Sequence, residues 1–132
     1  IDFPVFRLAE MHLIYAEAVL RGGSGDVNLG LNYINQIRGR AYANDPNSSL
    51  GNITNSEMTL DFILDERARE LLWEGFRRTD LIRYKRFTTA DYLWAWKGGV
   101  KKGAAVNAKF RLFPIPVTDL LANPKLKQNP GY

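Results

Sequence analysis

The sequence predicts an all-α protein, built from helical hairpins and followed by a long irregular C-terminal segment. Apolar residues recur at helical spacing in four stretches between residues 7 and 87. Glycines and polar turn residues separate these stretches, and residues that cap helices open two of them. Beyond residue 87, prolines lack an amide donor and keep the residues before them out of the helical conformation.

The first two predicted helices form a hairpin at about residues 7–41. The first runs from Arg7 to Arg21 and ends at Gly22-Gly23, since glycine readily takes the left-handed conformation of a helix C-terminus. Its predicted apolar stripe is Leu8, Met11, Tyr15, Ala18 and Val19. Asp26 caps the second helix, whose stripe is Val27, Leu31, Ile34 and Arg38. Such a hairpin is the unit of tetratricopeptide-like α-α superhelices.

Further along the chain, residues 43–55 are rich in polar and small side chains and predict a surface loop. Helices follow over about 59–87. A third helix is capped by Thr59 and runs to Glu74, and a short fourth helix runs from Arg78 to Phe87. The apolar face of the third helix is Leu60, Ile63, Leu64, Leu71 and Leu72.

The irregular tail covers residues 88–132. We expect one helical turn in it, Asp119 to Ala122, which Thr118 caps. Apolar side chains are expected to dock this tail onto the helices, so that it crosses back over them in an ordered path. These side chains are Phe113, Ile115, Leu120, Leu126 and Tyr132.

Composition excludes several kinds of site. The chain has no cysteine and a single histidine, His12, so we expect no metal and no cofactor. No apolar run approaches the roughly 20 residues that span a bilayer, and Ile1 to Pro4 lack the features of a signal peptide. The net charge of +4 is concentrated after Arg83. A basic surface of this kind is more often solvated than bound to nucleic acid, so no nucleic-acid partner is expected.

The densest group of charged residues lies between Asp65 and Arg83. Three glutamates recur there every four residues and share one helix face, as the carboxylates of a glycosidase could. Arginines lie among all of them and favour ionised carboxylates, which argues against a proton donor. We therefore expect a non-catalytic ion-pair network that ties the third helix to the fourth across Gly75. Its members are Glu66, Arg67, Glu70, Glu74, Arg77, Asp80 and Arg83.

A second candidate site consists of aromatic residues in the tail. Tyr92, Trp94 and Trp96 alternate, which would place all three on one side of an extended segment. Flat aromatic faces suit the apolar faces of sugar rings, so these are the predicted ligand-binding residues. The alternative is that they form core and cover the third helix.

Five motifs in order resemble the C-terminal region of the SusD/RagB family of outer-membrane nutrient-binding lipoproteins. They are RLAEMHLIYAEA (7–18), LNYINQIRGRA (31–41), the charged stretch 66–83, LFPIP (112–116) and QNPGY (128–132). The motifs cover nearly the whole chain. The resemblance identifies residues 1–132 as the C-terminal region of a larger protein.

The resemblance implies a non-catalytic component that binds a glycan or peptide. Its implied partner is a SusC-like, TonB-dependent outer-membrane transporter, and its implied location is the outside of the outer membrane. A lipid anchor upstream of this chain would hold it there, and further tetratricopeptide-like helices would also lie upstream. In the family, sugar contacts come largely from those other regions. The alternative function, supported by the hairpin alone, is a stand-alone helical protein-interaction module.

Overall fold

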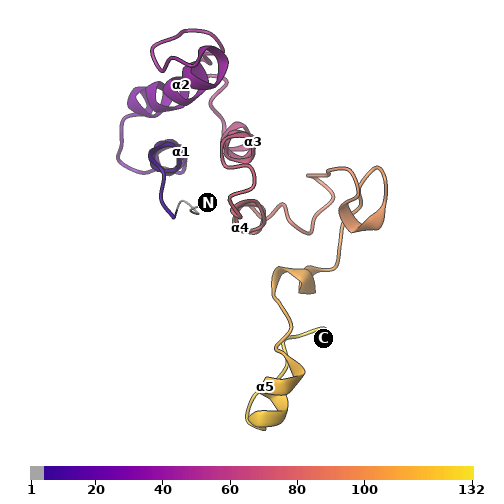
Figure 1. The fold of residues 1–132 in the computed structure, drawn as a ribbon. Coiled ribbons are helices and arrows are strands. Elements are labelled where there is room, and N and C mark those ends of the chain that lie inside the picture. The colour runs from indigo at the N-terminus through magenta and orange to yellow at the C-terminus, as the bar shows by residue number, and fades with distance from the viewer. Residues whose placement is uncertain (1–4) are drawn as a thin grey trace. The chain divides into compact units, whose positions relative to one another are not determined.

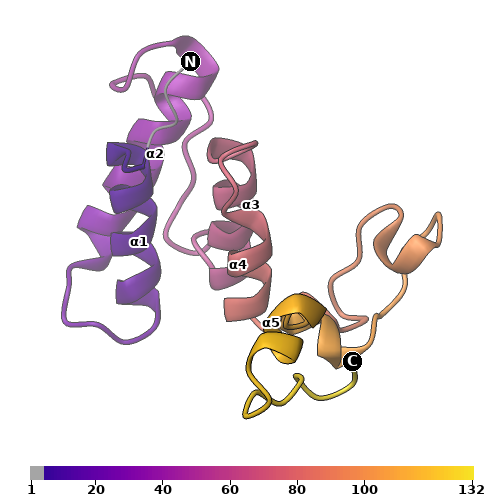
Figure 2. The ribbon, with the colours of Figure 1, turned by 60° about the horizontal axis from the view of Figure 1, so that its bottom comes forward.

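A computed structural model describes residues 5–132 as two compact units (Figures 1 and 2). Unit 1 ends at Arg77 and unit 2 runs from Arg78 to Tyr132. The helices are α1 (Leu8–Leu20), α2 (Val27–Ala43), α3 (Leu60–Glu70), α4 (Arg77–Arg83) and α5 (Val117–Ala122), with 3₁₀ turns η1 (Lys97–Gly99) and η2 (Ala108–Arg111). The described residues contain no β-strand, so the all-α prediction is confirmed. The four N-terminal residues, on which the signal-peptide argument rests, lie outside the described range.

The predicted hairpin is present, and α1 lies alongside α2 (Figure 2). Gly22 ends α1 with φ +96°, in the left-handed region that glycine enters without strain. The Asp26 carboxylate caps α2 by accepting a hydrogen bond from the Asn28 amide at 2.8 Å. The Asp26 amide donates to the Tyr15 hydroxyl at 2.9 Å, which fastens the connection to α1. Local capping chemistry therefore sets both ends of the hairpin linker.

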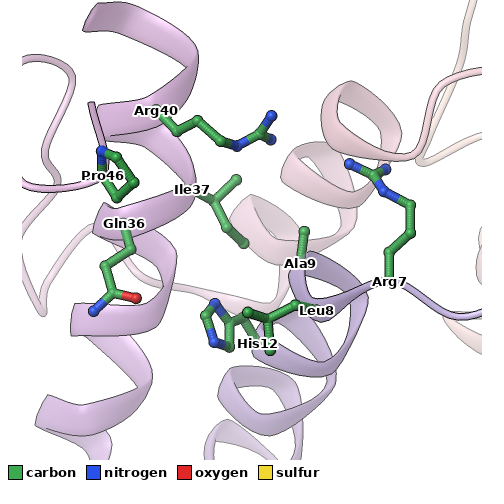
Figure 3. A pocket seen from close by; sticks show the side chains of 8 residues that line it. All are labelled: Arg7, Leu8, Ala9, His12, Gln36, Ile37, Arg40 and Pro46. Atoms are coloured by element: carbon green, nitrogen blue, oxygen red, sulfur yellow. The ribbon is translucent and has the colours of Figure 1, made fainter. Parts of the chain in front are cut away.

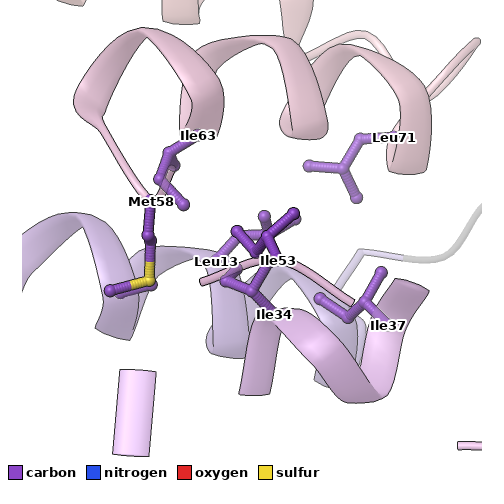
Figure 4. Close-up of a cluster of buried hydrophobic side chains, with 8 residues drawn as sticks. Leu13, Ile34, Ile37, Ile53, Met58, Ile63 and Leu71 are labelled. Carbon is purple, nitrogen blue, oxygen red and sulfur yellow. The ribbon is translucent and has the colours of Figure 1, made fainter. Parts of the chain in front are cut away.

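The core of unit 1 lies where α1 packs against both α2 and α3 (Figure 4). Residues of the loop between α2 and α3 complete it, so this loop is partly internal rather than wholly on the surface. The buried core side chains are Leu13, Ala16, Ile34, Ile37, Ile53, Met58, Ile63 and Leu71. Asn35 of α2 holds this loop in place. Its side chain accepts a hydrogen bond from the Ile53 amide at 2.9 Å and donates one to the Ile53 carbonyl at 3.1 Å.

The predicted stripe of α1 was correct for Val19, which is buried, but wrong at three other positions. Leu8, Met11 and Ala18 are exposed, whereas Leu13 and Ala16 are buried. The reason is that α1 carries apolar residues on nearly every side, so its sequence has no single face that is clearly hydrophobic. Only packing against α2 and α3 selects the buried face.

The third and fourth helices are shorter than predicted. Thr59 caps α3 as expected, accepting from the Phe62 amide at 3.1 Å, but α3 ends at Glu70 rather than Glu74. Trp73 then has φ +67° and Gly75 has φ +81°, which helical residues cannot adopt. Leu72 is consequently exposed instead of lying on the apolar face. The fourth helix ends at Arg83, and Lys85 has φ +60°.

The tail closes on itself within unit 2. Gln128 clamps Ile115 by accepting from its amide at 2.8 Å and donating to its carbonyl at 2.9 Å. Asn129 donates to the Phe113 carbonyl at 2.7 Å. Phe113, Leu126 and Tyr132 are exposed, so the expected burial of these three side chains is wrong. Polar side chains bond the backbone of the tail instead. Pro116, not Thr118, precedes the last helix, α5.

Two glycines of α2 give opposite expected results when changed to alanine. Alanine favours a helix by about 1 kcal/mol. A Cβ on Gly39 would lie 2.6 Å from the Ser48 carbonyl oxygen, however, and overpacking of this kind costs about 1–3 kcal/mol. We therefore expect Gly39→Ala to lower the free energy of unfolding by about 1 kcal/mol. Gly30→Ala, whose Cβ would lie 3.4 Å from Ala16, should raise it. Urea titration measures the free energy of unfolding of both variants. A higher value than the wild type for both would contradict the proposed clash at Gly39.

Candidate functional site

The candidate site is a pocket of about 410 Å³ formed entirely by unit 2. This volume falls in the range of about 300–1,000 Å³ that is usual for small-molecule sites. Six aromatic side chains and two cations line most of it. The lining residues are Arg78, Phe87, Trp94, Trp96, Lys97, Gly98, Val106, Phe110, Leu112, Phe113 and Tyr132. Since most of these side chains are apolar, the pocket offers flat hydrophobic faces to a ligand.

The structure brings together two of the three predicted ligand-binding residues. Trp94 and Trp96 both line the pocket, whereas Tyr92 is not among its lining residues. The segment is also not extended, because Trp96 has φ +69° and turns the chain into η1. Trp96 is 66% exposed, which is incompatible with a core position. The indole N–H groups of Trp94 and Trp96 donate to no residue in the described part of the chain, so both can donate to a ligand.

The two cations of the pocket are held by backbone carbonyls. Arg78 donates through Nη2 to the carbonyls of Phe110 and Arg111, at 2.9 and 3.1 Å. Its guanidinium lies 4.1 Å from the centre of the Phe113 ring, a cation–π contact. Lys97 is buried and donates to three carbonyls of the preceding loop. Both cations therefore organise the pocket walls.

Several ion pairs of the charged stretch 65–83 reach residues outside it. In unit 1, Glu66 accepts from Arg38 of α2 at 2.9 Å and from Arg69 at 2.6 Å. Glu70 accepts from Arg40 of α2 and from Arg7, both at 2.6 Å. These contacts fix α3 against α2 and against the residue that precedes α1.

The remaining predicted members have the following contacts. Glu74 pairs with Arg7. Arg67 is buried, and its Nη2 atom lies 4.0 Å from a carboxylate oxygen of Glu10. The Nη2 atom of Arg77 lies 4.0 Å from a carboxylate oxygen of Asp65. In unit 2, Arg83 lies 2.9 Å from the buried Asp80. Arginine donors thus contact the carboxylates of both Glu66 and Glu70.

Sequence reasoning missed the most important partners of the carboxylates. Arg7, Arg38 and Arg40 lie 28 to 67 residues away from the glutamates that they pair with. Arg38 was placed in an apolar stripe, and its position four residues after the buried Ile34 was the signal that it faces α3. Nothing in the local sequence around Arg7 or Arg40 indicates a partner on α3.

A second pocket, of about 390 Å³, lies in unit 1 between the start of α1 and the end of α2 (Figure 3). His12 lines it and stacks on Tyr33, with ring centres 4.2 Å apart and planes 4° from parallel. Burial lowers the pKa of His12, so its imidazole is neutral at neutral pH. Arg7 and Arg40, which also line the pocket, both hold Glu70. Its polar groups thus serve packing between the helices.

Residues 5–132 contain neither a metal site nor a membrane-spanning helix. No cluster of three or more metal-ligating side chains occurs among these residues. No helix within the same range is both long enough and apolar enough to cross a bilayer.

Comparison with known proteins gives consistent matches over the whole chain. The SusD family profile matches residues 1–132. Starch-binding protein SusD of Bacteroides thetaiotaomicron is 43% identical over 131 residues, and a SusD-like protein of Formosa agariphila is 33% identical over 135 residues. These matches cover 99% and 97% of this chain but only 22% and 24% of the relatives. The chain therefore spans about a quarter or less of their length.

Solved structures resemble this chain in the same way. A SusD superfamily protein from Bacteroides vulgatus superimposes with a TM-score of 0.73 at 34% identity, covering 97% of this chain and 27% of that one. Surface glycan-binding protein A from Bacteroides thetaiotaomicron, in complex with laminarihexaose, superimposes with a TM-score of 0.69 at 27% identity. That match covers 96% of this chain and 24% of the other.

Proposed function

The chain belongs to the SusD family, and from this premise we propose that it is the C-terminal region of a larger, non-catalytic glycan-binding protein. One observation carries the proposal: the chain aligns end to end with a starch-binding protein at 43% identity. The structure of one relative was solved in complex with laminarihexaose, which is also a glucan. The ligand proposed for the whole protein is therefore an oligosaccharide, in preference to a peptide.

We further propose that the whole protein serves nutrient uptake at the cell surface. In this proposal a TonB-dependent, SusC-like transporter is the partner, and a lipid anchor in the upstream part of the protein holds it to the outer membrane. Family membership supports both statements. The match to about a quarter of longer relatives favours this function over a stand-alone helical interaction module.

The arrangement of the carboxylates supports a binding protein over a glycosidase. The acidic residues that could act as an acid/base pair, Glu66 and Glu70, accept hydrogen bonds from arginines of α2. Glycosidases need one protonated carboxyl, whose pKa must be raised. In this chain, guanidinium groups already occupy the carboxylate oxygens of both residues. The two relatives whose names state a ligand are also named as binding proteins.

Within this chain, we propose that Trp94 and Trp96 contact the glycan in the unit 2 pocket. Both indoles line one pocket, and Trp96 is largely exposed. A sugar ring presents C–H groups on one face and hydroxyls around its edge. The first suit an indole face, and the second can accept from the indole N–H.

Alanine substitution of these residues in the full-length protein tests the site. Trp94→Ala and Trp96→Ala are each expected to weaken binding of laminarihexaose or a starch oligosaccharide about tenfold, as loss of an aromatic anchor does. Isothermal titration calorimetry measures the affinity. Trp73→Ala is the matched control, because Trp73 is exposed but lies in unit 1. Unchanged affinity in the Trp94/Trp96 double variant would remove the site but not the function. Failure of the wild type to bind any glycan would remove the function itself.

A further inference from the structure

Lys97 is the most unusual residue of the pocket wall. Its side chain is 2% exposed, although lysine is almost never fully buried without a charged partner. The Nζ atom donates to the carbonyl oxygens of Arg86, Thr89 and Tyr92, at 3.1, 2.5 and 2.7 Å. An ammonium has three N–H donors, and all three are used here. The geometry thus holds a charged amine, coordinated by backbone oxygens as a bound cation would be.

These three carbonyls come from one irregular stretch of seven residues. The stretch contains no helix that could order it. The hydrogen bonds from the Lys97 ammonium therefore hold the carbonyls of its successive turns close together. Further along, the Lys97 carbonyl accepts from the Ala104 amide at 3.0 Å, and the Val106 amide donates to Thr88 at 3.0 Å. Lys97 therefore links both sides of the loop 86–106.

The same residue contacts the aromatic wall directly. Its Nζ lies 4.6 Å from the centre of the Trp94 ring, within the range of a cation–π interaction. Its amide donates to the Trp94 carbonyl at 3.1 Å, and the turn that follows is closed by the Gly99 amide donating to Trp96 at 3.0 Å. The positions of both tryptophans thus depend on the lysine beside them.

The energetics favour a role in geometry over one in stability. Burial lowers the pKa of Lys97, and the carboxylate of Asp91 acts in the opposite direction. Taking an ammonium out of water is costly, and its hydrogen bonds only offset that cost. An apolar side chain of the same length would avoid this cost, but it has no donors and could not hydrogen-bond the three carbonyls.

We propose that Lys97 is a positioning residue for glycan binding, an internal cation whose carbonyl cage holds Trp94 and Trp96 in the orientation that receives the sugar. The proposal rests on the function proposed above for the unit 2 pocket. Lys97 itself donates no hydrogen bond to the ligand, because every donor of its ammonium is bound to the backbone.

Lys97→Met in the full-length protein tests this role, since methionine keeps an apolar stem but has no donor. The affinity for the glycan is expected to fall tenfold or more. Amide hydrogen exchange over residues 86–106 should accelerate, while the amides of α1, α2 and α3 should be unchanged. Lys101→Met is the matched control, because it removes an exposed charge from the same unit. Its affinity should remain within twofold of the wild type.

A double-mutant cycle separates positioning from a general structural role. If Lys97 acts through the tryptophan, Lys97→Met should weaken binding far less in a Trp94→Ala background than in the wild type. Additive losses would overturn the proposal, as would a Lys97→Met protein with wild-type affinity. Should the wild type bind no glycan, the function proposed for the pocket fails and the positioning role with it. The exchange data would then still decide whether Lys97 orders the loop.

Discussion

Replacing Arg67 with alanine is expected to lower the free energy of unfolding by about 2–5 kcal/mol, the usual cost of removing one member of a buried ion pair. Arg67 is 4% exposed and lies 4.0 Å from the carboxylate of Glu10, which is also buried. The guanidinium also lies 5.9 Å from the centre of the Phe76 ring. Its loss would leave the Glu10 charge in the protein interior without this partner.

Arg69→Ala is the matched control for Arg67→Ala. Arg69 lies on the same helix, α3, but its side chain is 54% exposed, and Glu66 keeps Arg38 as a partner when Arg69 is removed. The expected loss is at most about 0.5 kcal/mol, as for other exposed ion pairs. Urea unfolding followed by circular dichroism measures both variants. Equal transition midpoints for Arg67→Ala and the wild type would show that the buried pair contributes nothing to stability.

The second large effect is expected for Leu13, at the centre of the core of unit 1. Leu13→Ala should cost about 2–5 kcal/mol, because the cavity that it leaves is closed in by α2 and α3. Leu8, on the same helix, is 71% exposed in this chain, so Leu8→Ala should change the stability of the isolated chain by at most about 0.5 kcal/mol. Thermal melts of the two variants measure the difference.

In the full-length protein, Leu8→Ala is expected to be destabilising as well. Leu8, Met11 and Ile14 are exposed at every third position of α1, and Phe6 is exposed just before the helix. Large apolar side chains that gather on one surface often mark an interaction site. If upstream helices cover these side chains, the isolated chain should bind more hydrophobic dye than the longer protein. An isolated chain without excess dye binding, together with a silent Leu8→Ala in the longer protein, would contradict this expectation.

Local sequence determined the existence of the helices and most of their ends. Asp26 and Thr59 cap their helices through hydrogen bonds to amides two and three residues away, and Gly22 ends α1 with a conformation of its own. These interactions need only neighbouring residues, so they can be predicted without knowledge of the fold. The family membership was also accessible, because its motifs are contiguous and occur in order.

Only the tertiary structure decided which surfaces meet. The helix α1 is apolar on nearly every side, and packing against α2 and α3 selected Leu13 over Leu8 as the core residue. Glu70 pairs with Arg40 of α2 and with Arg7, which precedes α1. Trp94 and Trp96 line the same pocket because the chain turns at Trp96, not because they alternate along an extended segment. The ion pairs of Glu70 join residues distant in the chain, so their geometry depends on the loops between them as well as on the helices. The cage around Lys97 is local in the chain but equally hard to predict, since its three partners are backbone carbonyls, which carry no signal in the sequence.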